Sequence, residues 1–193
     1  MLILIVYGST EGHTRHLSEC LAGCLKDAGY EAEVYEAEVM DSALATDDLN
    51  PSDYDAVLVA ASLHVGRYQS AVVQFARLHH EGLNETPSAF ISVSLSAAGV
   101  SPHDWEGLEQ CLARFLHETM WRPNAIHHAA GAIRYSQYDF FKRLAIDFIA
   151  RQHGQATVTS QDYDFTNYPA LKTFVLEFIG DQVEKRRHHS PDG

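Results

Sequence analysis

An unbroken apolar run, Leu2–Tyr7, ends at Gly8 and leads directly into a polar loop. A short, continuously apolar run is typical of a strand that is buried on both faces, as in a parallel sheet. The following stretch, Thr14–Ala28, places apolar residues at helical spacing and stops at Gly29, which is a common helix end signal. The chain therefore begins with a strand, a loop and a helix.

The same alternation continues along the chain. We expect further strands at Glu31–Tyr35, Tyr54–Ala61, Ser88–Leu95 and Ala125–Ile133, and further helices at Gln69–Glu81, His103–Met120 and Tyr168–Val183. The strand at Glu31–Tyr35 alternates apolar and charged residues, which places it near a sheet edge. Alternating strands and helices of this length predict an α/β fold with a doubly wound, five-stranded parallel sheet. Such sheets bind ligands beyond the carboxyl ends of their strands.

An insertion separates the last predicted strand from the last helix. Its centre, Tyr138–Arg151, has an apolar stripe at helical spacing and is expected to form an amphipathic helix. A short strand is expected within Asp162–Tyr168, and Lys185–Gly193 is expected to be a polar, disordered tail. We therefore predict one domain over 1–184, an insertion over 134–163 within it, and a tail over 185–193.

Composition excludes several classes of protein. The 193 residues carry 14 Lys and Arg against 26 Asp and Glu, a net charge of −12, which opposes binding to nucleic acid. We expect neither a secretion signal nor a transmembrane helix, because no apolar run has the required length and flanks. Three cysteines without zinc spacing favour a reducing, cytoplasmic location.

The loop Gly8–Thr14 lies where an anion site is expected. Backbone N–H groups and a helix N-terminus converge there, Gly12 permits close backbone approach, and the loop hydroxyls add donors. The loop lacks the lysine of a P-loop and the G-x-G-x-x-G pattern of dinucleotide sites. It is predicted to hold a phosphate, and the alternative is a simple helix cap.

In its strand and helix context this loop resembles the phosphate-binding loop of flavodoxins, which hold FMN without a cationic side chain. Further stretches, Ala60–Gly66, Pro87–Leu95, Trp121–Pro123 and Ala130–Tyr135, resemble the menaquinone-dependent protoporphyrinogen IX dehydrogenase branch of that superfamily. The resemblance extends from Leu2 to about Glu177 and includes the insertion. It implies a flavodoxin-like fold with one bound FMN.

The resemblance also implies the residues of the cofactor site. The phosphate would be surrounded by Ser9, Thr10, Glu11, Gly12, His13 and Thr14. The isoalloxazine would lie between Ser62, Leu63, His64, Val65 and Gly66 on one side and Ser94, Leu95, Ser96, Ala97 and Ala98 on the other. Without the resemblance, both flanking stretches would be interpreted as simple connections.

Three interpretations of the insertion remain open. Its apolar stripe could pack on the sheet edge, or the segment could dock on the inner face of the membrane, because 134–154 carries four basic and two acidic residues, a net charge of +2. In the third interpretation it binds a flat substrate by stacking and by pairing with carboxylates. The residues for this role are Arg134, Tyr135, Tyr138, Phe141, Lys142 and Arg143.

The implied activity is an FMN-dependent oxidation of protoporphyrinogen IX, a step of haem synthesis, with menaquinone or another quinone as electron acceptor. The chemistry would take place on the flavin, so no side chain is assigned as catalytic. Adjacent histidines such as His127 and His128 diverge in direction, and no metal site is predicted. Two alternatives remain: an electron carrier whose acidic surface docks on a redox protein, and a quinone reductase that uses NAD(P)H.

Overall fold

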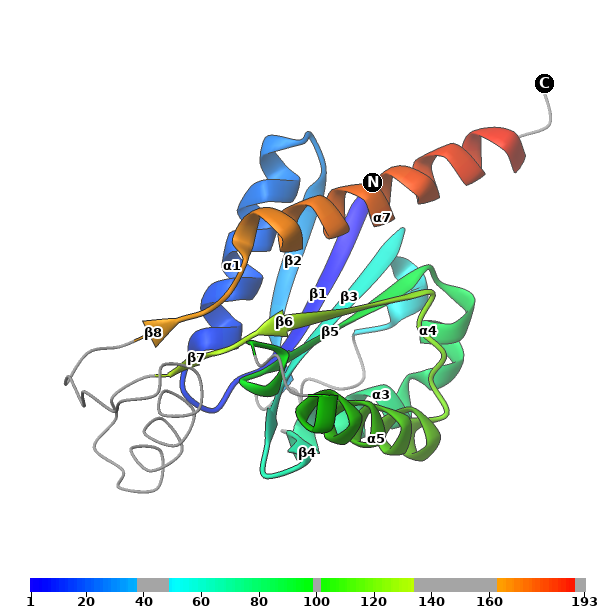
Figure 1. Cartoon of the computed structure of the whole chain (residues 1–193). Coiled ribbons are helices and arrows are strands. Elements are labelled where there is room, and N and C mark those ends of the chain that lie inside the picture. The colour runs from blue at the N-terminus through cyan, green and yellow to red at the C-terminus, as the bar shows by residue number, and fades with distance from the viewer. Residues whose placement is uncertain (38–48, 99–101, 134–162, 190–193) are drawn as a thin grey trace.

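The computed structural model describes residues 1–37, 49–98, 102–133 and 163–189. A central sheet has helices on both faces (Figure 1). Its parallel strands are β1 (Leu2–Gly8), β2 (Glu31–Glu36), β3 (Ala56–His64), β5 (Ser88–Ser94) and β6 (Ala125–Ala130), in the spatial order β2-β1-β3-β5-β6. This doubly wound arrangement confirms the predicted fold class, and β2 lies at an edge as expected.

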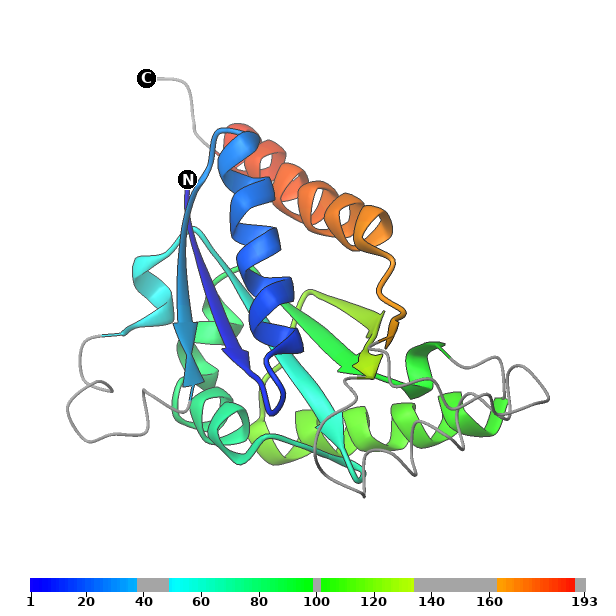
Figure 2. The same ribbon diagram turned by 90° about the vertical axis from the view of Figure 1, so that its left-hand side faces the viewer.

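Two helices cover one face of the sheet. Helix α1 (His13–Asp27) and helix α7 (Tyr168–His189) lie side by side there (Figure 2). Every second side chain of β1, such as Ile3 and Ile5, packs against fully buried leucines of α1 and against Val175 of α7. The apolar side chains of α1, which recur about every 3.6 residues, thus form one helix face. This face packs on the alternate side chains that β1 presents on one side of the sheet.

The opposite face is covered by α3 (Ser70–Leu78), α4 (His80–Glu85) and α5 (Pro102–Thr119). Here Leu4 and Val6 of β1 pack with an aromatic cluster that includes Phe90, Phe115 and the fully buried Trp121. The Trp121 indole donates to Ser88 Oγ at 2.9 Å. The buried indole N–H is therefore satisfied, as burial requires.

Several element boundaries differ from those predicted. The loop expected at Ser62–Tyr68 is wrong: β3 continues to His64 and pairs antiparallel with β4 (Arg67–Tyr68). The helix expected at Gln69–Glu81 is two helices, because His79 has a φ of −106° and ψ of 17° at their junction. Helix α7 continues to His189, so its expected end at Val183 is wrong.

The strand expected at Ala125–Ile133 is interrupted at Gly131. Strand β6 ends at Ala130, and β7 (Ala132–Ile133) leaves the main sheet to pair antiparallel with β8 (Tyr163–Asp164). A Cβ on Gly131 would lie 3.4 Å from the Ser94 carbonyl carbon, so the missing side chain allows the chain to pass close to the end of β5. The predicted short strand in Asp162–Tyr168 is confirmed by β8. Two further predictions, the helix at Tyr138–Arg151 and most of the insertion, lie outside the described residues.

Candidate functional site

The loop Ser9–Gly12 lies between β1 and α1, at the carboxyl end of β1, which is paired on both sides by β2 and β3. Gly12 forms the N-cap of α1 with a left-handed φ of 80°, and no side chain caps the helix. A residue with a Cβ is strained at this φ. The first N–H groups of α1 thus lie beside this loop, in the position that favours an anion.

Ser9 is the clearest sign that a ligand belongs in this loop. Its hydroxyl oxygen is buried and lacks a hydrogen-bond partner within the described part of the chain. A buried hydroxyl without a partner is unfavourable and rare in native proteins. A phosphate oxygen in the loop would accept from this hydroxyl, so the residues present fit the phosphate group of a cofactor.

Gln69 connects the phosphate loop to the neighbouring strand end. Its Nε2 donates to Thr10 Oγ1 at 3.3 Å and also to Ser62 Oγ. Because Thr10 Oγ1 accepts here, its own proton is available for an acceptor in the loop. Gln69 thereby fixes the spacing between the predicted phosphate residues and the first of the predicted ring residues.

The hairpin of β3 and β4 carries Ser62–Gly66, the first of the two segments predicted to flank the isoalloxazine ring. We call these two segments the ring walls. Val65 and Gly66 form its turn with φ of 48° and 74°, and Val65 is 82% exposed at the tip. A positive φ is unusual for a β-branched residue and marks local strain. Burial lowers the pKa of His64, so its imidazole is neutral at pH 7.

The second predicted ring wall follows β5. Ser94 is buried, and its Oγ accepts from the Ala97 N–H at 3.2 Å. The short 3-10 helix η2 (Ser96–Ala98) comes next, and its residues are half-buried. The two walls are joined below the surface, since the Tyr68 hydroxyl lies 2.8 Å from Ser92 Oγ. The structure therefore brings the three predicted cofactor segments to one end of the sheet.

His13 has a role that the sequence did not suggest. Its side chain is buried, and Nε2 lies 2.9 Å from Thr166 Oγ1, which in turn donates to the Ala130 carbonyl at 2.7 Å. This arrangement requires His13 Nε2 to carry a proton and donate to Thr166. The imidazole therefore fastens the phosphate loop to the segment that follows the insertion, and its backbone N–H remains at the start of α1.

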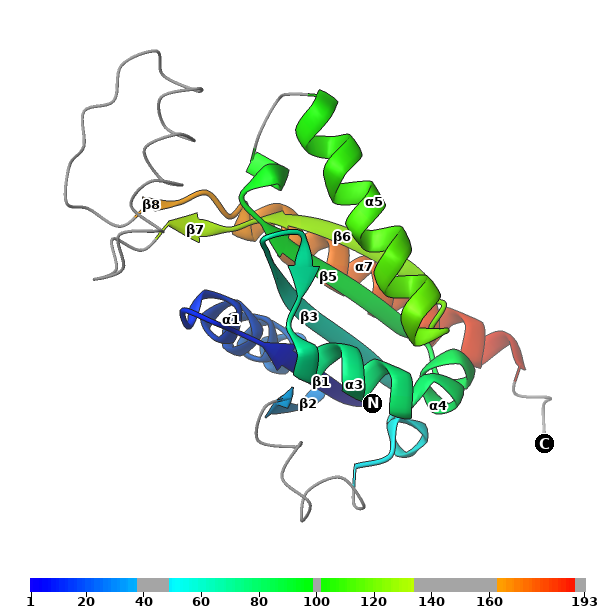
Figure 3. The ribbon, with the colours of Figure 1, turned by 90° about the horizontal axis from the view of Figure 1, so that it is seen from below.

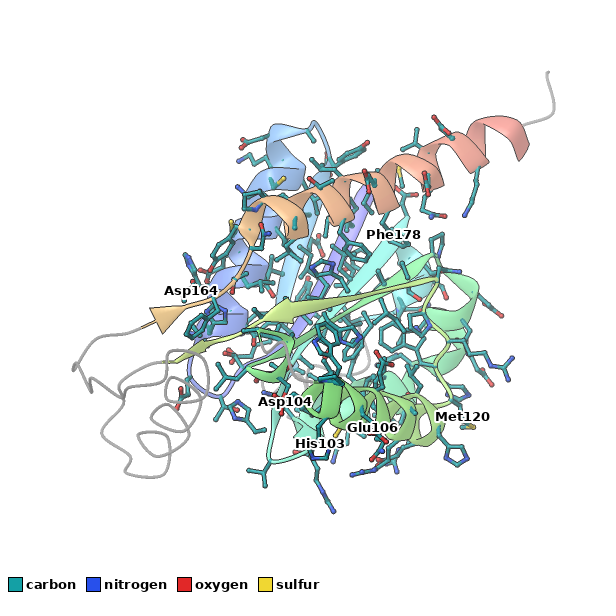
Figure 4. All side chains as sticks on the ribbon, in the orientation of Figure 1. His103, Asp104, Glu106, Met120, Asp164 and Phe178 are labelled. Carbon is teal, nitrogen blue, oxygen red and sulfur yellow. The ribbon has the colours of Figure 1, made fainter. Side chains whose placement is uncertain are left out.

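Asp164, the last residue of β8, also contributes to the contact between His13 and Thr166 (Figure 4). Its carboxylate accepts from the Thr166 N–H and the Tyr168 hydroxyl, each at 2.9 Å, and lies 3.9 Å from His13 Nε2. Burial alone would raise the pKa of Asp164, but the hydrogen bonds from Thr166 and Tyr168 outweigh it and hold that pKa below its ordinary value. The ionised carboxylate of Asp164 therefore stabilises the folded state at neutral pH, and this contribution is lost as the pH falls through the Asp164 pKa.

Replacing Thr166 by Val should disrupt this contact between Thr166 and His13. The change leaves the His13 imidazole and the Ala130 carbonyl without their shared partner, which typically costs about 1–3 kcal/mol. We expect a lower free energy of unfolding in urea titrations. Thr173 on α7 is exposed, so Thr173→Val is the matched control and should change stability by less than about 0.5 kcal/mol. Equal stability of the two variants would contradict this role of Thr166.

Several charged residues and histidines outside the predicted cofactor segments have partners within the fold. Arg15, the first cation after the loop, is bound by the Tyr7 hydroxyl at 2.9 Å and by Glu36. His127 stacks on Phe174, and His128 contacts Glu109. Among the described residues no cluster of metal-ligating side chains occurs. The six predicted substrate residues, Arg134, Tyr135, Tyr138, Phe141, Lys142 and Arg143, lie outside the described residues.

Residues 4–160 match the flavodoxin domain family. The chain belongs to this family. The flavodoxin domain is also 32% identical over 178 residues to a protein of Escherichia coli (strain K12) named protoporphyrinogen IX dehydrogenase [quinone], a match that covers 92% of this chain and 94% of that one. A protein of the same name from Leishmania major is 30% identical over 178 residues, covering 91% of this chain and 73% of that one. The resemblance noted in the sequence is confirmed.

Among solved structures, the C101S mutant of the flavodoxin from Pseudomonas aeruginosa aligns with a TM-score of 0.47 and 18% identity, over 79% of this chain and 96% of that one. Family membership makes FMN the cofactor of this flavodoxin domain and an FMN-dependent oxidoreductase its class of enzyme, as the sequence led us to expect. None of the helices in the described part of the chain combines the length and apolarity needed to cross a bilayer.

Proposed function

We propose that this flavodoxin domain oxidises protoporphyrinogen IX and passes the electrons through FMN to a quinone. The observation that carries the proposal is the near full-length similarity to the Escherichia coli protein of that name, which covers 94% of that protein. A similarity restricted to the cofactor loop would support FMN binding alone. This one continues beyond the cofactor segments, so it also supports the substrate class.

Bound FMN supplies the hydride-accepting and electron-transferring chemistry. In our proposal the residues from Ser9 to Thr14 hold its phosphate through backbone N–H groups and hydroxyls. The segments Ser62–Gly66 and Ser94–Ala98 hold the ring on two sides, where their small side chains allow backbone amides to approach its polar edge. Gln69 Oε1 is a buried acceptor without a partner in the described part of the chain, and it is suited to accept from a hydroxyl of the cofactor.

The substrate would meet the ring beside the insertion. Protoporphyrinogen IX carries pyrrole rings and carboxylates, so aromatic and basic side chains suit it. In our proposal Tyr135, Tyr138 and Phe141 supply the stacking surface, and Arg134, Lys142 and Arg143 pair with the carboxylates. Both ends of the insertion are fixed near the cofactor segments by the β7 and β8 pairing and by the contact of Thr166 with His13.

An anaerobic donor screen tests the proposed function. The purified FMN-loaded protein is mixed separately with protoporphyrinogen IX, with NADH or NADPH, and with a dithionite-reduced redox protein, and the flavin absorbance is followed. We expect protoporphyrinogen IX to bleach the flavin and a quinone to restore it. Bleaching by NADPH but not by protoporphyrinogen IX would overturn the proposal in favour of a nicotinamide-dependent reductase. Reduction by the redox protein alone would indicate an electron carrier.

The carboxylate pairing gives a second prediction. Arg134→Gln, Lys142→Gln and Arg143→Gln should each raise the KM for protoporphyrinogen IX by about two- to fivefold, the range of a solvent-exposed charge pair. FMN affinity should stay unchanged, because the proposed cofactor segments are intact. Lys185→Gln on α7 removes a similar exposed charge elsewhere and is the control. A KM equal to that of the control in all three variants would exclude carboxylate pairing.

We also propose that the protein meets its lipid-soluble quinone at the inner face of the membrane. The net charge of +2 over 134–154, in a chain of −12, supports contact with anionic lipids through this segment. Co-sedimentation should be detected with vesicles that contain anionic lipid and should disappear with purely zwitterionic vesicles. Equal recovery with both kinds of vesicle would contradict an electrostatic contact.

A further inference from the structure

A pocket of about 370 Å³ lies between β4, α3 and α5, and it adjoins the proposed cofactor segment Ser62–Gly66 at Gly66. Figure 3 shows these three elements together on the face of the sheet opposite α1 and α7. The pocket lining includes the turn residue Gly66 and the thiol of Cys111, whose sulfur would lie 3.8 Å from a Cβ placed on Gly66. No residue of the phosphate loop contributes to the lining.

Three arginines from three different elements line this pocket. Arg67 lies on β4, Arg77 in the last turn of α3, and Arg114 on α5, whereas Glu118 is the only acidic residue of the lining. The lining therefore carries a net charge of +2, although the chain as a whole carries −12. Like charges that line one pocket repel one another, and a bound anion would relieve this repulsion.

The three guanidinium groups of Arg67, Arg77 and Arg114 form no ion pair with a carboxylate of the described residues, 1–37, 49–98, 102–133 and 163–189. This differs from Arg15, whose guanidinium is paired with Glu36. The donors of the pocket are therefore available to a bound molecule.

Three side chains of the lining, Tyr68, Val73 and Phe115, form an apolar patch in this pocket. The buried rings of Tyr68 and Phe115 contact each other, with centroids 5.0 Å apart, and Val73 lies beside them. The Tyr68 hydroxyl is bonded to Ser92 Oγ, and burial raises the pKa of Tyr68 to about 12, so this side chain stays neutral. An apolar wall with a few convergent charged groups is the usual construction of a small-molecule site.

We infer that this pocket binds a small molecule with two or more anionic groups, either carboxylates or phosphates. The planar fork of each guanidinium matches both groups in a bidentate manner. Three such forks from separate elements require a ligand with more than one anionic group to engage them together. The volume of about 370 Å³ falls within the range of small-molecule pockets.

Calorimetric titration of the FMN-loaded protein tests this inference. Inorganic pyrophosphate serves as the phosphate probe and citrate as the carboxylate probe, both at constant ionic strength. We expect saturable binding of at least one, and the stronger of the two identifies the anionic group. Arg67→Gln, Arg77→Gln and Arg114→Gln should each weaken binding by about three- to tenfold. No binding of either probe at about 10 mM would overturn the inference.

Arg122→Gln is the matched control. Arg122 is exposed and is absent from the pocket lining, so its replacement removes the same charge without touching the site. We expect unchanged affinity in this variant. An equal loss in Arg122→Gln and Arg114→Gln would show that the anion responds only to total charge, which would overturn the inference.

The reactivity of the Cys111 thiol tests whether the anion binds in this pocket. A bound anion should slow alkylation of Cys111 by iodoacetamide, a neutral reagent, by several-fold, as measured by mass spectrometry of the modified peptides. Cys20 and Cys24 on α1 are half-buried free thiols outside the pocket and are the internal references. The flavin absorbance verifies that FMN stays bound. Binding without any protection of Cys111 would place the anion elsewhere and overturn the inference.

Discussion

The Ser9→Ala variant should bind FMN about 10- to 100-fold more weakly, while its FMN-free form should be more stable than that of the unchanged protein. Both effects follow from one buried hydroxyl without a partner in the described part of the chain. In the free protein its desolvation is uncompensated, so its removal gains about 1 kcal/mol. With cofactor bound, the same hydroxyl donates to a charged phosphate, a hydrogen bond of about 1.5–3 kcal/mol.

Fluorescence titration of FMN measures the affinity, and urea unfolding of the FMN-free protein measures the stability. Ser18 supplies a matched control, because its hydroxyl is also buried without a partner in the described part of the chain but belongs to α1 rather than to the loop. Ser18→Ala should give a similar gain in stability and unchanged FMN affinity. If both serine variants bind FMN equally well, the phosphate is not held by Ser9.

The second large effect is expected at Gly8, where β1 ends against α3. A Cβ on Gly8 would lie 2.5 Å from Cγ2 of the fully buried Val72 and 3.2 Å from Oε1 of Gln69. Val72 is β-branched and held in a helix, so it has little rotamer freedom to move away. Gly8→Ala should therefore lower the free energy of unfolding by about 1–3 kcal/mol, the usual cost of overpacking.

Gly8→Ala should also weaken FMN binding, because any shift of Gln69 disturbs its hydrogen bonds to Thr10 and Ser62. Gly23 is the control: it is exposed on α1, and a Cβ there meets nothing within 4 Å. Gly23→Ala should stabilise the protein by about 0.5–1 kcal/mol, since Ala is the better helix former, with unchanged FMN affinity. A Gly8→Ala variant as stable as Gly23→Ala would contradict this prediction, because it would show that α3 moves away from the added methyl group without lowering the free energy of unfolding.

The fold was predictable because its strands are distinct in composition. Leu2–Tyr7 is apolar at every position, which identifies a central strand, and the charged alternation of Glu31–Tyr35 identifies an edge. The boundaries that failed depend on tertiary contacts. Small residues around Ser62 have the composition of a loop, and only the pairing with Arg67 and Tyr68 extends β3 to His64. The turn at Val65 adopts a backbone conformation that its side chain disfavours.

The three proposed cofactor segments were predicted from the sequence, and the fold brings them to one end of the sheet, but their contacts were not predicted. The loop from Ser9 to Thr14 was identified because its backbone follows a central strand and starts a helix. Gln69 was missed because its contacts connect a loop residue, Thr10, with a strand residue, Ser62, that is distant in sequence. Thr166 was missed for a similar reason, since only the fold brings it to His13. Polar residues that directly follow a strand or an insertion are the one signal that would have drawn attention to both.

The short ladder between β7 and β8 has a consequence for protein engineering. The backbone of Ala132 pairs with Asp164 and that of Ile133 with Tyr163, so the chain leaves the body and returns to it at neighbouring positions. The segment between these ends is therefore connected to the rest of the chain at two neighbouring positions. The residues from 134 to 162 can thus be exchanged for a two-residue turn, or for the equivalent segment of a relative, without reconnecting any strand of the main sheet. Under our proposal that this segment binds the substrate, exchanging one contiguous piece of sequence should change the substrate while the main sheet stays intact.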